Sequence, residues 1–244
     1  MNNAEWFVDW FNSPYYHLLY NNRNFNEAHF FIDNLCNNLD LQPAAKLWDL
    51  ACGKGRHAIA LNEKGFDVTG SDLSENSIHE ASQYSNDTLH FFVHDMRLPF
   101  REHYFDAVFN LFTSFGYFSN VKDNFLVFKN VAAALKKHGC FVIDFLNSEK
   151  ICESSFLPQY VEKRGDITFT IRKKIVDNAI HKRIEFSDAG KHYYFEETVS
   201  LLRKEDFESY AKAADLSLCE TFGNYLLEPF DERHSDRLIL IFKK

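Results

Sequence analysis

The spacing of apolar residues changes twice along the chain, and the changes divide it into three predicted parts. Over residues 1–45, apolar residues recur every three or four positions, which predicts helices, and Ser13-Pro14 marks a break between two of them. From residue 46 to about 150, short apolar runs alternate with helical stretches. Beyond residue 150, polar and apolar residues alternate, which is typical of strands with one buried face.

The middle part shows the strand-helix repeat of a parallel sheet with helices on both faces. Its strands are predicted at residues 46–50, 66–71, 89–94, 105–111 and 139–145. A helix is predicted at 124–136, where apolar residues again repeat every three or four positions. Ligands of such sheets bind beyond the carboxyl ends of the strands, so we expect the functional residues just after each strand.

The last part predicts antiparallel structure. Alternating runs at 167–176, 180–187 and 192–201 are separated by residues typical of tight turns, which indicates an insertion of about three strands. A helix at 204–214 and two strands at 216–222 and 237–242 complete the main sheet. The predicted organisation is a helical segment at 1–45, an α/β domain at 46–150 and 202–244, and an antiparallel insertion at 151–201.

Composition narrows the class of protein. The 244 residues are 45% hydrophobic, enough for one good core, and the formal net charge of −8 argues against a nucleic-acid surface. No apolar run approaches the ~18 residues that span a bilayer. Five widely spaced cysteines without a C-x-x-C pair favour free thiols over disulfides or zinc. We therefore expect a cytoplasmic protein with no membrane, nucleic-acid or metal partner.

A glycine turn between the first predicted strand and the next helix is the strongest functional signal. The sequence Asp-Leu-Ala-Cys-Gly-Lys-Gly occupies residues 49–55. Glycine allows positive φ and lets a ligand lie against bare main chain, while free N–H groups at a helix start face the bound group. The arrangement predicts a nucleotide cradle rather than a simple turn.

Two kinds of cofactor are compatible with the glycine spacing. Gly53 and Gly55 fit the dinucleotide pattern, and Asp72 lies 19 positions after Gly53, where such folds place a ribose-binding acid. Asp49, four residues before Gly53, discriminates between them, because a carboxylate there repels a pyrophosphate and attracts an ammonium group. S-adenosylmethionine, which joins an amino acid to an adenine nucleoside, is the cofactor that Asp49 favours.

Acidic residues also follow the second and third strands. Asp72 can accept hydrogen bonds from both ribose hydroxyls, although a helix-capping role is the alternative. Asp95, before Met96, can accept from an adenine amino group, with a solvated turn as its alternative. The polar and aromatic loop at 112–118 is expected to form the floor of the reaction centre.

Residues 46–145 resemble the Rossmann-like domain of class I S-adenosylmethionine-dependent methyltransferases, and the motifs at 49–55 and 68–74 are similar to those of glycine N-methyltransferase-like members. The resemblance implies a seven-stranded, mostly parallel sheet with helices on both faces. It implies that the first acid and the glycine loop hold methionine, that Asp72 holds ribose, and that Asp95 and Met96 hold adenine. The implied cofactor-binding residues are Asp49, Ala51, Gly53, Gly55, Asp72, Leu73, Asp95, Met96 and, through its carbonyl, Leu111.

The same resemblance gives roles to the flanking parts. Tyr16, Tyr20 and Arg23 have the i, i+4, i+7 spacing of one helical face, and a guanidinium there could clamp a carboxylate. A surface salt bridge is the alternative for Arg23. Tyr and Arg residues of this region close over the cofactor in the family, so residues 1–45 are expected to form a helical lid, and 151–201 to cover the active site.

The expected reaction is in-line transfer of a methyl group to N or O of a small molecule, with S-adenosylhomocysteine as product. Tyr117, His57 and His192 are candidate bases, but no triad-like arrangement assigns a catalytic residue. The fourth strand lacks the Asn/Asp-Pro-Pro-Tyr signature, which favours a small-molecule acceptor, expected to contact Tyr117 and Tyr225. The rival hypotheses are an NAD-dependent oxidoreductase and a non-catalytic S-adenosylmethionine-binding regulator.

Overall fold

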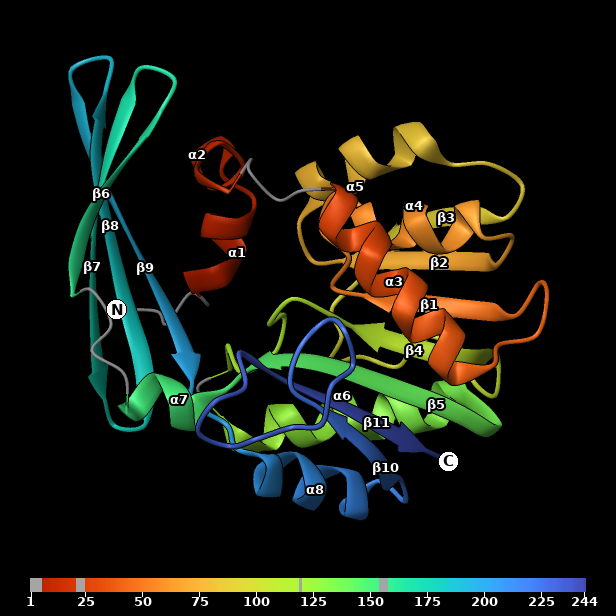
Figure 1. Ribbon diagram of the computed structural model, residues 1–244. Helices are drawn as coiled ribbons and strands as arrows, with labels where there is room; N and C mark the ends of the chain where they lie inside the picture. Colours follow the sequence, from red (N-terminus) through yellow and green to blue (C-terminus); the bar gives the residue numbers. More distant parts are fainter. Residues whose placement is uncertain (1–5, 21–24, 119, 154–157) are drawn as a thin grey trace.

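The fold is built on a seven-stranded sheet with the strand order β10-β11-β5-β4-β1-β2-β3. The computed structural model describes residues 6–20, 25–118, 120–153 and 158–244 (Figure 1). The strands of this sheet are β1 (Lys46–Leu50), β2 (Asp67–Asp72), β3 (Leu89–Val93), β4 (Phe105–Asn110), β5 (Leu135–Leu146), β10 (Ser217–Phe222) and β11 (Arg237–Lys243). The first five are parallel, while β11 runs antiparallel to β5 and to β10. The predicted mostly parallel Rossmann-like sheet is thereby confirmed.

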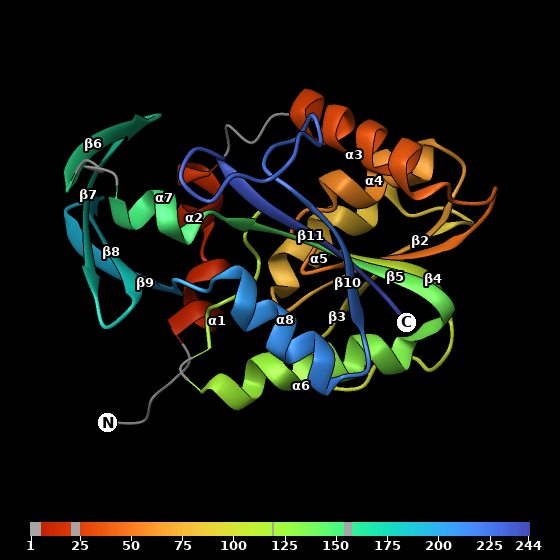
Figure 2. The ribbon, with the colours of Figure 1, turned by 60° about the horizontal axis from the view of Figure 1, so that its bottom comes forward.

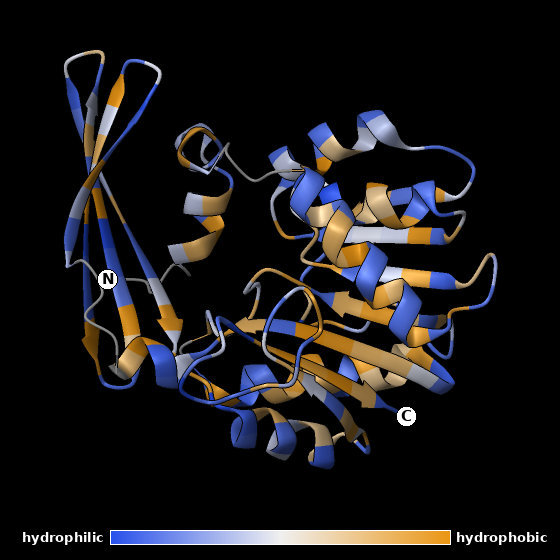
Figure 3. Cartoon of the chain, viewed as in Figure 1, coloured by the Kyte–Doolittle hydropathy of each residue, from blue (hydrophilic) through white to orange (hydrophobic). Residues whose placement is uncertain are grey.

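Both faces of this sheet are buried, because successive side chains along each strand point to opposite sides. Leu47 and Phe109 face α3 (Phe25–Leu39) and α4 (Arg56–Glu63). Trp48 and Val108 face α6 (Val121–Ala134) and α8 (Lys204–Ala213). Figure 2 shows the two helix layers with the strands between them, and Figure 3 shows that β4, β5 and β11 are hydrophobic along most of their length.

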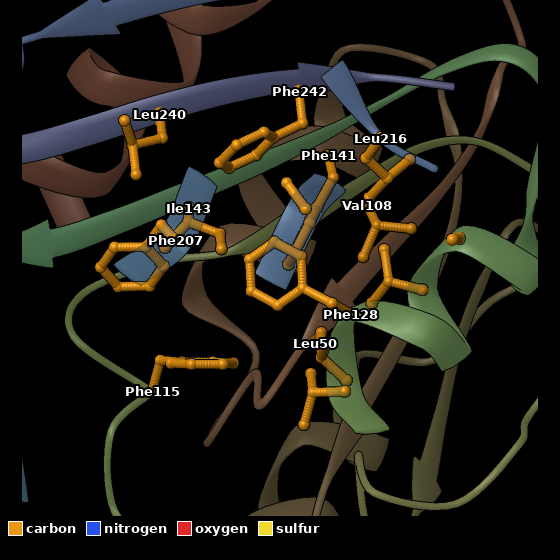
Figure 4. Close-up of a cluster of buried hydrophobic side chains, with 14 of the residues drawn as sticks. Leu50, Val108, Phe115, Phe128, Phe141, Ile143, Phe207, Leu216, Leu240 and Phe242 are labelled. Atoms are coloured by element: carbon orange, nitrogen blue, oxygen red, sulfur yellow. The ribbon is translucent and has the colours of Figure 1, made fainter. Parts of the chain in front are cut away.

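The face under α6 and α8 contains an aromatic cluster centred on Phe128 (Figure 4). The Phe128 ring lies 5.3 Å from that of Phe141, 5.7 Å from that of Phe242 and 5.8 Å from that of Phe115. All three contacts are edge-to-face, a geometry that aromatic rings prefer. Phe115 belongs to the loop after β4, so the core anchors the middle of the segment 112–118, predicted to form the floor of the reaction centre.

The insertion is a separate sheet of four strands rather than about three. They are β6 (Gln159–Arg164), β7 (Ile167–Val176), β8 (Ala179–Asp188) and β9 (Lys191–Ser200), paired antiparallel in this order. The sequence did not indicate β6, because only Tyr160 and Val161 are apolar in it and Val161 is 61% exposed. Main-chain pairing with β7, rather than burial of an apolar face, maintains this edge strand.

The first two helices pack on this second sheet. α1 (Trp6–Phe11) and α2 (Pro14–Leu19) are separated where Ser13 caps α2 by accepting from the Tyr15 N–H at 3.2 Å, which confirms the predicted break. Trp10 and Leu19 share a buried cluster with Phe169 and Ile184. In Figure 1, α1 and α2 lie between the second sheet and the α/β domain. Consequently, these two helices and the second sheet share one small core.

The second half of the predicted helical segment 1–45 packs on the α/β domain instead of on the second sheet. α3 packs on α4, and its buried residues Phe31 and Leu35 belong to the main core. The remaining short elements are α5 (Glu75–Ala81), a 3₁₀ helix (Ser82–Tyr84) and α7 (Ser148–Glu153). No helix among the described residues is long and apolar enough to cross a membrane. The division into lid, domain and covering insertion stays a prediction.

Replacing Phe128 with alanine tests the aromatic cluster. Because the ring is fully buried among other rings, we expect Phe128→Ala to lower the free energy of unfolding by about 3–5 kcal/mol. Urea denaturation measures the change, and Val121→Ala on the same helix, where Val121 is 65% exposed, serves as the control. Equal effects of the two substitutions would contradict the central position of Phe128.

Candidate functional site

A cavity of about 470 Å³ lies at the carboxyl ends of β1, β2, β3 and β4, with α1 and α2 contributing to its wall. The following predicted residues line it: Tyr16, Tyr20, Ala51, Gly53, Asp72, Leu73, Asp95, Met96, Leu111 and Tyr117. Asp49, Gly55 and Tyr225 are not on the wall, and Arg23 lies outside the described residues. The cavity thus brings together residues that are far apart in the sequence.

The glycine loop has the predicted left-handed backbone. Gly53 has φ 55° and Gly55 has φ 81°, values that L side chains rarely adopt. A Cβ on Gly55 would lie 2.7 Å from the Phe91 ring, whereas a Cβ on Gly53 would meet no atom within 4 Å. Gly55 therefore allows close packing at the start of α4, and Gly53 leaves bare main chain toward the cavity.

Asp49 is buried beneath this loop, with 1% of its surface exposed. Burial raises the pKa of its carboxyl to about 7, even though a backbone hydrogen bond from Ala58 and the charge of Arg56 act in the opposite direction. Among the described residues its Oδ2 has no hydrogen-bond partner. A buried carboxylate oxygen with no partner is energetically costly, so the site is suited to a ligand cation that approaches directly or through water.

Asp72 ties the end of β2 to the glycine loop. Its Oδ2 accepts from the Gly53 N–H and its Oδ1 from the Ser74 N–H, both at 2.8 Å. The helix cap is Ser74, whose Oγ accepts from the Ser77 N–H at 3.1 Å, so Asp72 is not the capping residue itself. These bonds fix the carboxylate on the cavity wall, where a carboxylate can accept hydrogen bonds from a ligand.

Asp95 is held by Arg97, a residue that the sequence did not single out. Asp95 Oδ2 accepts from Arg97 Nη2 at 2.6 Å, and Oδ1 accepts from Arg97 Nε at 3.0 Å and from its main-chain N–H at 2.9 Å. Burial opposes ionisation of Asp95, but the hydrogen bonds from Arg97 outweigh it and lower the pKa. This acid therefore stays ionised, and an adenine amino group would share it with the guanidinium.

Arg56 is a second residue that the sequence analysis missed. It occupies the first position of α4 and lines the cavity, where its guanidinium lies 4.3 Å from the centre of the Phe112 ring and 3.7 Å from Glu27. Its position directly after Gly55 was the available signal. A cation at this end of the cavity can pair with a ligand carboxylate, the role predicted for Arg23.

Aromatic side chains form much of the remaining wall. The Phe11 ring lies 4.9 Å from that of Tyr16 and 5.3 Å from that of Tyr117. The Tyr20 hydroxyl donates to Glu197 on β9 at 2.7 Å, which links the wall to the second sheet. The predicted helical face does not extend as expected, because α2 ends at Leu19 and Tyr20 is its C-cap.

Of three further residues considered as acceptor contacts or bases, two lie away from the cavity wall. Tyr225 stacks on Phe31 at 4.2 Å and donates to Asp144 at 3.2 Å, and burial raises the pKa of its hydroxyl. His57 lines the cavity, whereas His192 is exposed on β9 and is not on the wall. In the part of the chain that the structure describes, no three His, Cys, Asp or Glu side chains are grouped as metal ligands.

Known proteins resemble this chain in sequence. Residues 48–139 match the family model described as a methyltransferase domain. The Bacillus subtilis (strain 168) protein YqeM, named as a methyltransferase, is 36% identical over 132 residues, which are 53% of this chain and 53% of that protein. A glycine/sarcosine N-methyltransferase of Parasynechococcus marenigrum (strain WH8102) is 28% identical over 160 residues, 62% of this chain and 56% of that protein. The chain spans about half the length of these curated relatives.

The fold is also similar to solved structures. An S-adenosylmethionine-dependent methyltransferase from Clostridium acetobutylicum ATCC 824 superimposes with a TM-score of 0.77 at 22% identity. The match covers 94% of this chain and 95% of that one. The likeness therefore extends over the whole architecture, including the segments before and after residues 48–139.

The raised pKa of Asp49 predicts how cofactor binding depends on pH. With a pKa of about 7, Asp49 is mostly protonated at pH 6 and mostly ionised at pH 8. If its carboxylate attracts the ammonium of S-adenosylhomocysteine, affinity should increase about tenfold over this interval. Isothermal titration calorimetry at both pH values measures it, and Asp49→Asn should bind weakly at pH 8 with a flat profile.

The folding stability of the unliganded protein should also depend on pH, in the direction opposite to cofactor affinity. Because the pKa of Asp49 is higher in the folded than in the unfolded chain, this group lowers folding stability as pH rises from about 4 to about 7. Asp49→Asn should remove that contribution. Identical pH profiles of binding and stability for the two proteins would contradict the role of Asp49.

Proposed function

We propose that the chain, whose residues 48–139 match a methyltransferase domain, is a class I S-adenosylmethionine-dependent methyltransferase that transfers a methyl group to a small-molecule acceptor, foremost an amine nitrogen. A relative named glycine/sarcosine N-methyltransferase supports nitrogen over oxygen. The lack of an assigned catalytic base also supports nitrogen. A neutral amine can attack the methyl group without a dedicated base, whereas a hydroxyl acceptor requires one.

The observation that carries this proposal is the position of Asp49. Its buried carboxylate lies under the glycine loop, where a dinucleotide would place its pyrophosphate and S-adenosylmethionine its amino acid. Asp72 and Asp95 follow on the cavity wall at the ends of the next two strands. The order of Asp49, Asp72 and Asp95 along the strand ends therefore matches one ligand that has an ammonium group, a ribose and an adenine in the same order.

For the cofactor we propose three groups of contacts. Asp49, Ala51, Gly53, Gly55 and the Leu111 carbonyl serve the methionine part, with Arg56 as an additional partner for its carboxylate. Asp72 and Leu73 serve the ribose, and Asp95 and Met96 the adenine. Tyr16, Tyr20 and, beyond the described residues, Arg23 close the site. When bound, the cofactor supplies a methyl group attached to a sulfonium sulfur. The neutral thioether that leaves needs no further activation.

The protein's own part in the reaction is alignment and exclusion of water. Aromatic rings of Phe11, Tyr16 and Tyr117 surround the acceptor side. The Tyr117 hydroxyl donates to the Thr113 carbonyl, so its oxygen can accept an N–H of the acceptor and orient the nitrogen lone pair. Tyr225, away from the cavity wall, is assigned a supporting rather than an acceptor-binding role.

The size of the cavity limits the acceptor. About 470 Å³ must hold both cofactor and acceptor and falls in the lower half of the ~300–1,000 Å³ range of small-molecule sites. Together with a net charge of −8, this favours a small metabolite over a nucleic acid.

Thermal unfolding with ligands tests the cofactor assignment. S-adenosylhomocysteine at ~100 times its dissociation constant should raise the melting temperature by roughly 5–10 °C, because binding only to the folded state adds about 2.7 kcal/mol. NADH at equal concentration is the control. A shift with NADH alone, or with neither ligand, would contradict the proposal.

Transfer of a labelled methyl group tests the activity itself. We expect labelled product from a panel of small primary and secondary amines, with slower or no labelling of matched phenols and alcohols. Preferential labelling of the hydroxyl compounds would assign the acceptor atom to oxygen. Stabilisation by S-adenosylhomocysteine without any labelled product would instead favour the non-catalytic regulator.

A further inference from the structure

Two consecutive residues of the loop after β4 have left-handed backbones although neither is glycine. Phe112 has φ 61° and Thr113 has φ 58°. A side chain with a Cβ disfavours this region, and for the β-branched threonine the conformation is a genuine outlier. Two adjacent residues keep this unfavourable backbone conformation only where contacts with their surroundings stabilise it.

Asp144 and Arg237 hold both residues. The Phe112 N–H donates to Asp144 Oδ2 and the Thr113 N–H donates to the Asp144 carbonyl, each at 2.9 Å. Arg237 Nη2 donates to Thr113 Oγ1, also at 2.9 Å. All three contacts act on the main chain or the hydroxyl of these two residues, so they bear directly on the conformation of the loop.

The two clamping residues are themselves paired in a buried position. Arg237 Nε donates to Asp144 Oδ1 at 2.7 Å, and the Asp144 side chain is fully buried. They come from adjacent strands, since Asp144 lies near the end of β5 and Arg237 begins β11. Tyr225 donates to Asp144 Oδ2 at 3.2 Å, so both carboxylate oxygens are occupied. The desolvation of two buried charges can offset their attraction, so a buried ion pair need not stabilise the fold. Another role therefore has to explain its presence.

The clamped loop carries side chains to the cavity wall. Phe112, Ser114 and Tyr117 line it, and the Tyr117 hydroxyl donates to the carbonyl of the clamped Thr113. The Phe112 ring lies against the Arg56 guanidinium at 4.3 Å. The clamp is therefore connected through one residue, Thr113, to the hydroxyl that faces the acceptor side.

We propose that Asp144 and Arg237 are positioning residues, which hold Phe112 and Thr113 in the left-handed conformation and thereby set the ring of Phe112 and the hydroxyl of Tyr117 at the methyl-transfer site. The functional part of this inference rests on the proposed methyltransferase activity. The structural part, that the clamp sets the loop conformation, stands independently of it.

The rival interpretation is that the ion pair only stabilises the fold. The loop has a second anchor, because Phe115 is fully buried between Phe128 and Phe207, at 5.8 and 5.7 Å between ring centres (Figure 4). Loss of the clamp should therefore leave the loop attached while releasing Phe112 and Thr113. This separation makes the two interpretations distinguishable.

Two substitutions at Thr113 test the clamp without breaking the buried ion pair. Thr113→Val keeps the shape but removes the oxygen that Arg237 contacts. Thr113→Asn keeps an acceptor and tolerates the left-handed conformation better than threonine. Asp144→Asn, which keeps an acceptor for the Phe112 N–H, disrupts the pair itself as an additional variant.

The control is an ion pair at the opposite end of the sheet. Lys136 Nζ contacts both Asp106 oxygens at 2.8 Å, far from the loop along β4 and β5. Lys136→Met should lower stability without altering the loop. It therefore shows what a purely stabilising contact does in the same measurements.

4-Fluorophenylalanine placed at position 112 reports the loop directly by ¹⁹F NMR. We expect a single resonance in the otherwise unchanged protein, in Thr113→Asn and in Lys136→Met, and a shifted or second resonance in Thr113→Val and Asp144→Asn. An unchanged resonance in Thr113→Val and Asp144→Asn would overturn the proposal, and so would the same change in Lys136→Met. This readout needs neither cofactor nor acceptor.

Methyl transfer to an amine identified from the panel gives the second readout. In Thr113→Val, without the fluorinated residue, the rate constant should fall on the order of 100-fold, as expected for a small displacement of aligned groups, and should recover in Thr113→Asn. Affinity for S-adenosylhomocysteine should change far less. An unchanged rate with a changed ¹⁹F spectrum would overturn the functional part, whereas absence of transfer in the unsubstituted chain would count against the proposed function instead.

Discussion

Burial of both faces of the parallel sheet is the constraint on which the rest of this structure depends. The central strands place Trp48 and Val108 under one helix layer and Leu47 and Phe109 under the other, which leaves their faces no room for solvated polar groups. Polar chemistry is then confined to the strand ends. The cavity lies at the carboxyl ends, where the loops can differ without disturbing the core.

The second sheet contributes to this cavity indirectly. None of its described residues lines the cavity, yet it shares a core with α1 and α2, and its Glu197 accepts hydrogen bonds from Trp10 at 2.7 Å and from Tyr20. The part of the wall that α1 and α2 contribute is thus packed against both units, because Phe7 of α1 belongs to the main core and Trp10 to the core of the second sheet.

The sequence predicted the parts of the fold that repeat and the residues that follow a strand. Strands β1 to β5 are signalled by apolar runs, and Asp72 and Asp95 by their place after such runs. It did not reveal β6, which is held by strand pairing rather than by apolar burial, nor Arg97, whose role depends on its hydrogen bonds to Asp95. Asp144 and Arg237 are 93 positions apart and meet only because β5 and β11 are neighbours in register. No local pattern can predict a pair of this kind.

The three carboxylates along the cavity differ in a way that follows from their partners. Asp95 is paired with Arg97, and Asp72 accepts hydrogen bonds from two main-chain N–H groups. Asp49 has Oδ2 unpartnered among the described residues, and burial brings its pKa to about 7. The need for a ligand cation is therefore greatest beneath the glycine loop and smallest at Asp95. Since an uncharged adenine requires no counter-charge and an ammonium does, this difference supports the proposed orientation of the cofactor, with its ammonium near Asp49 and its adenine near Asp95.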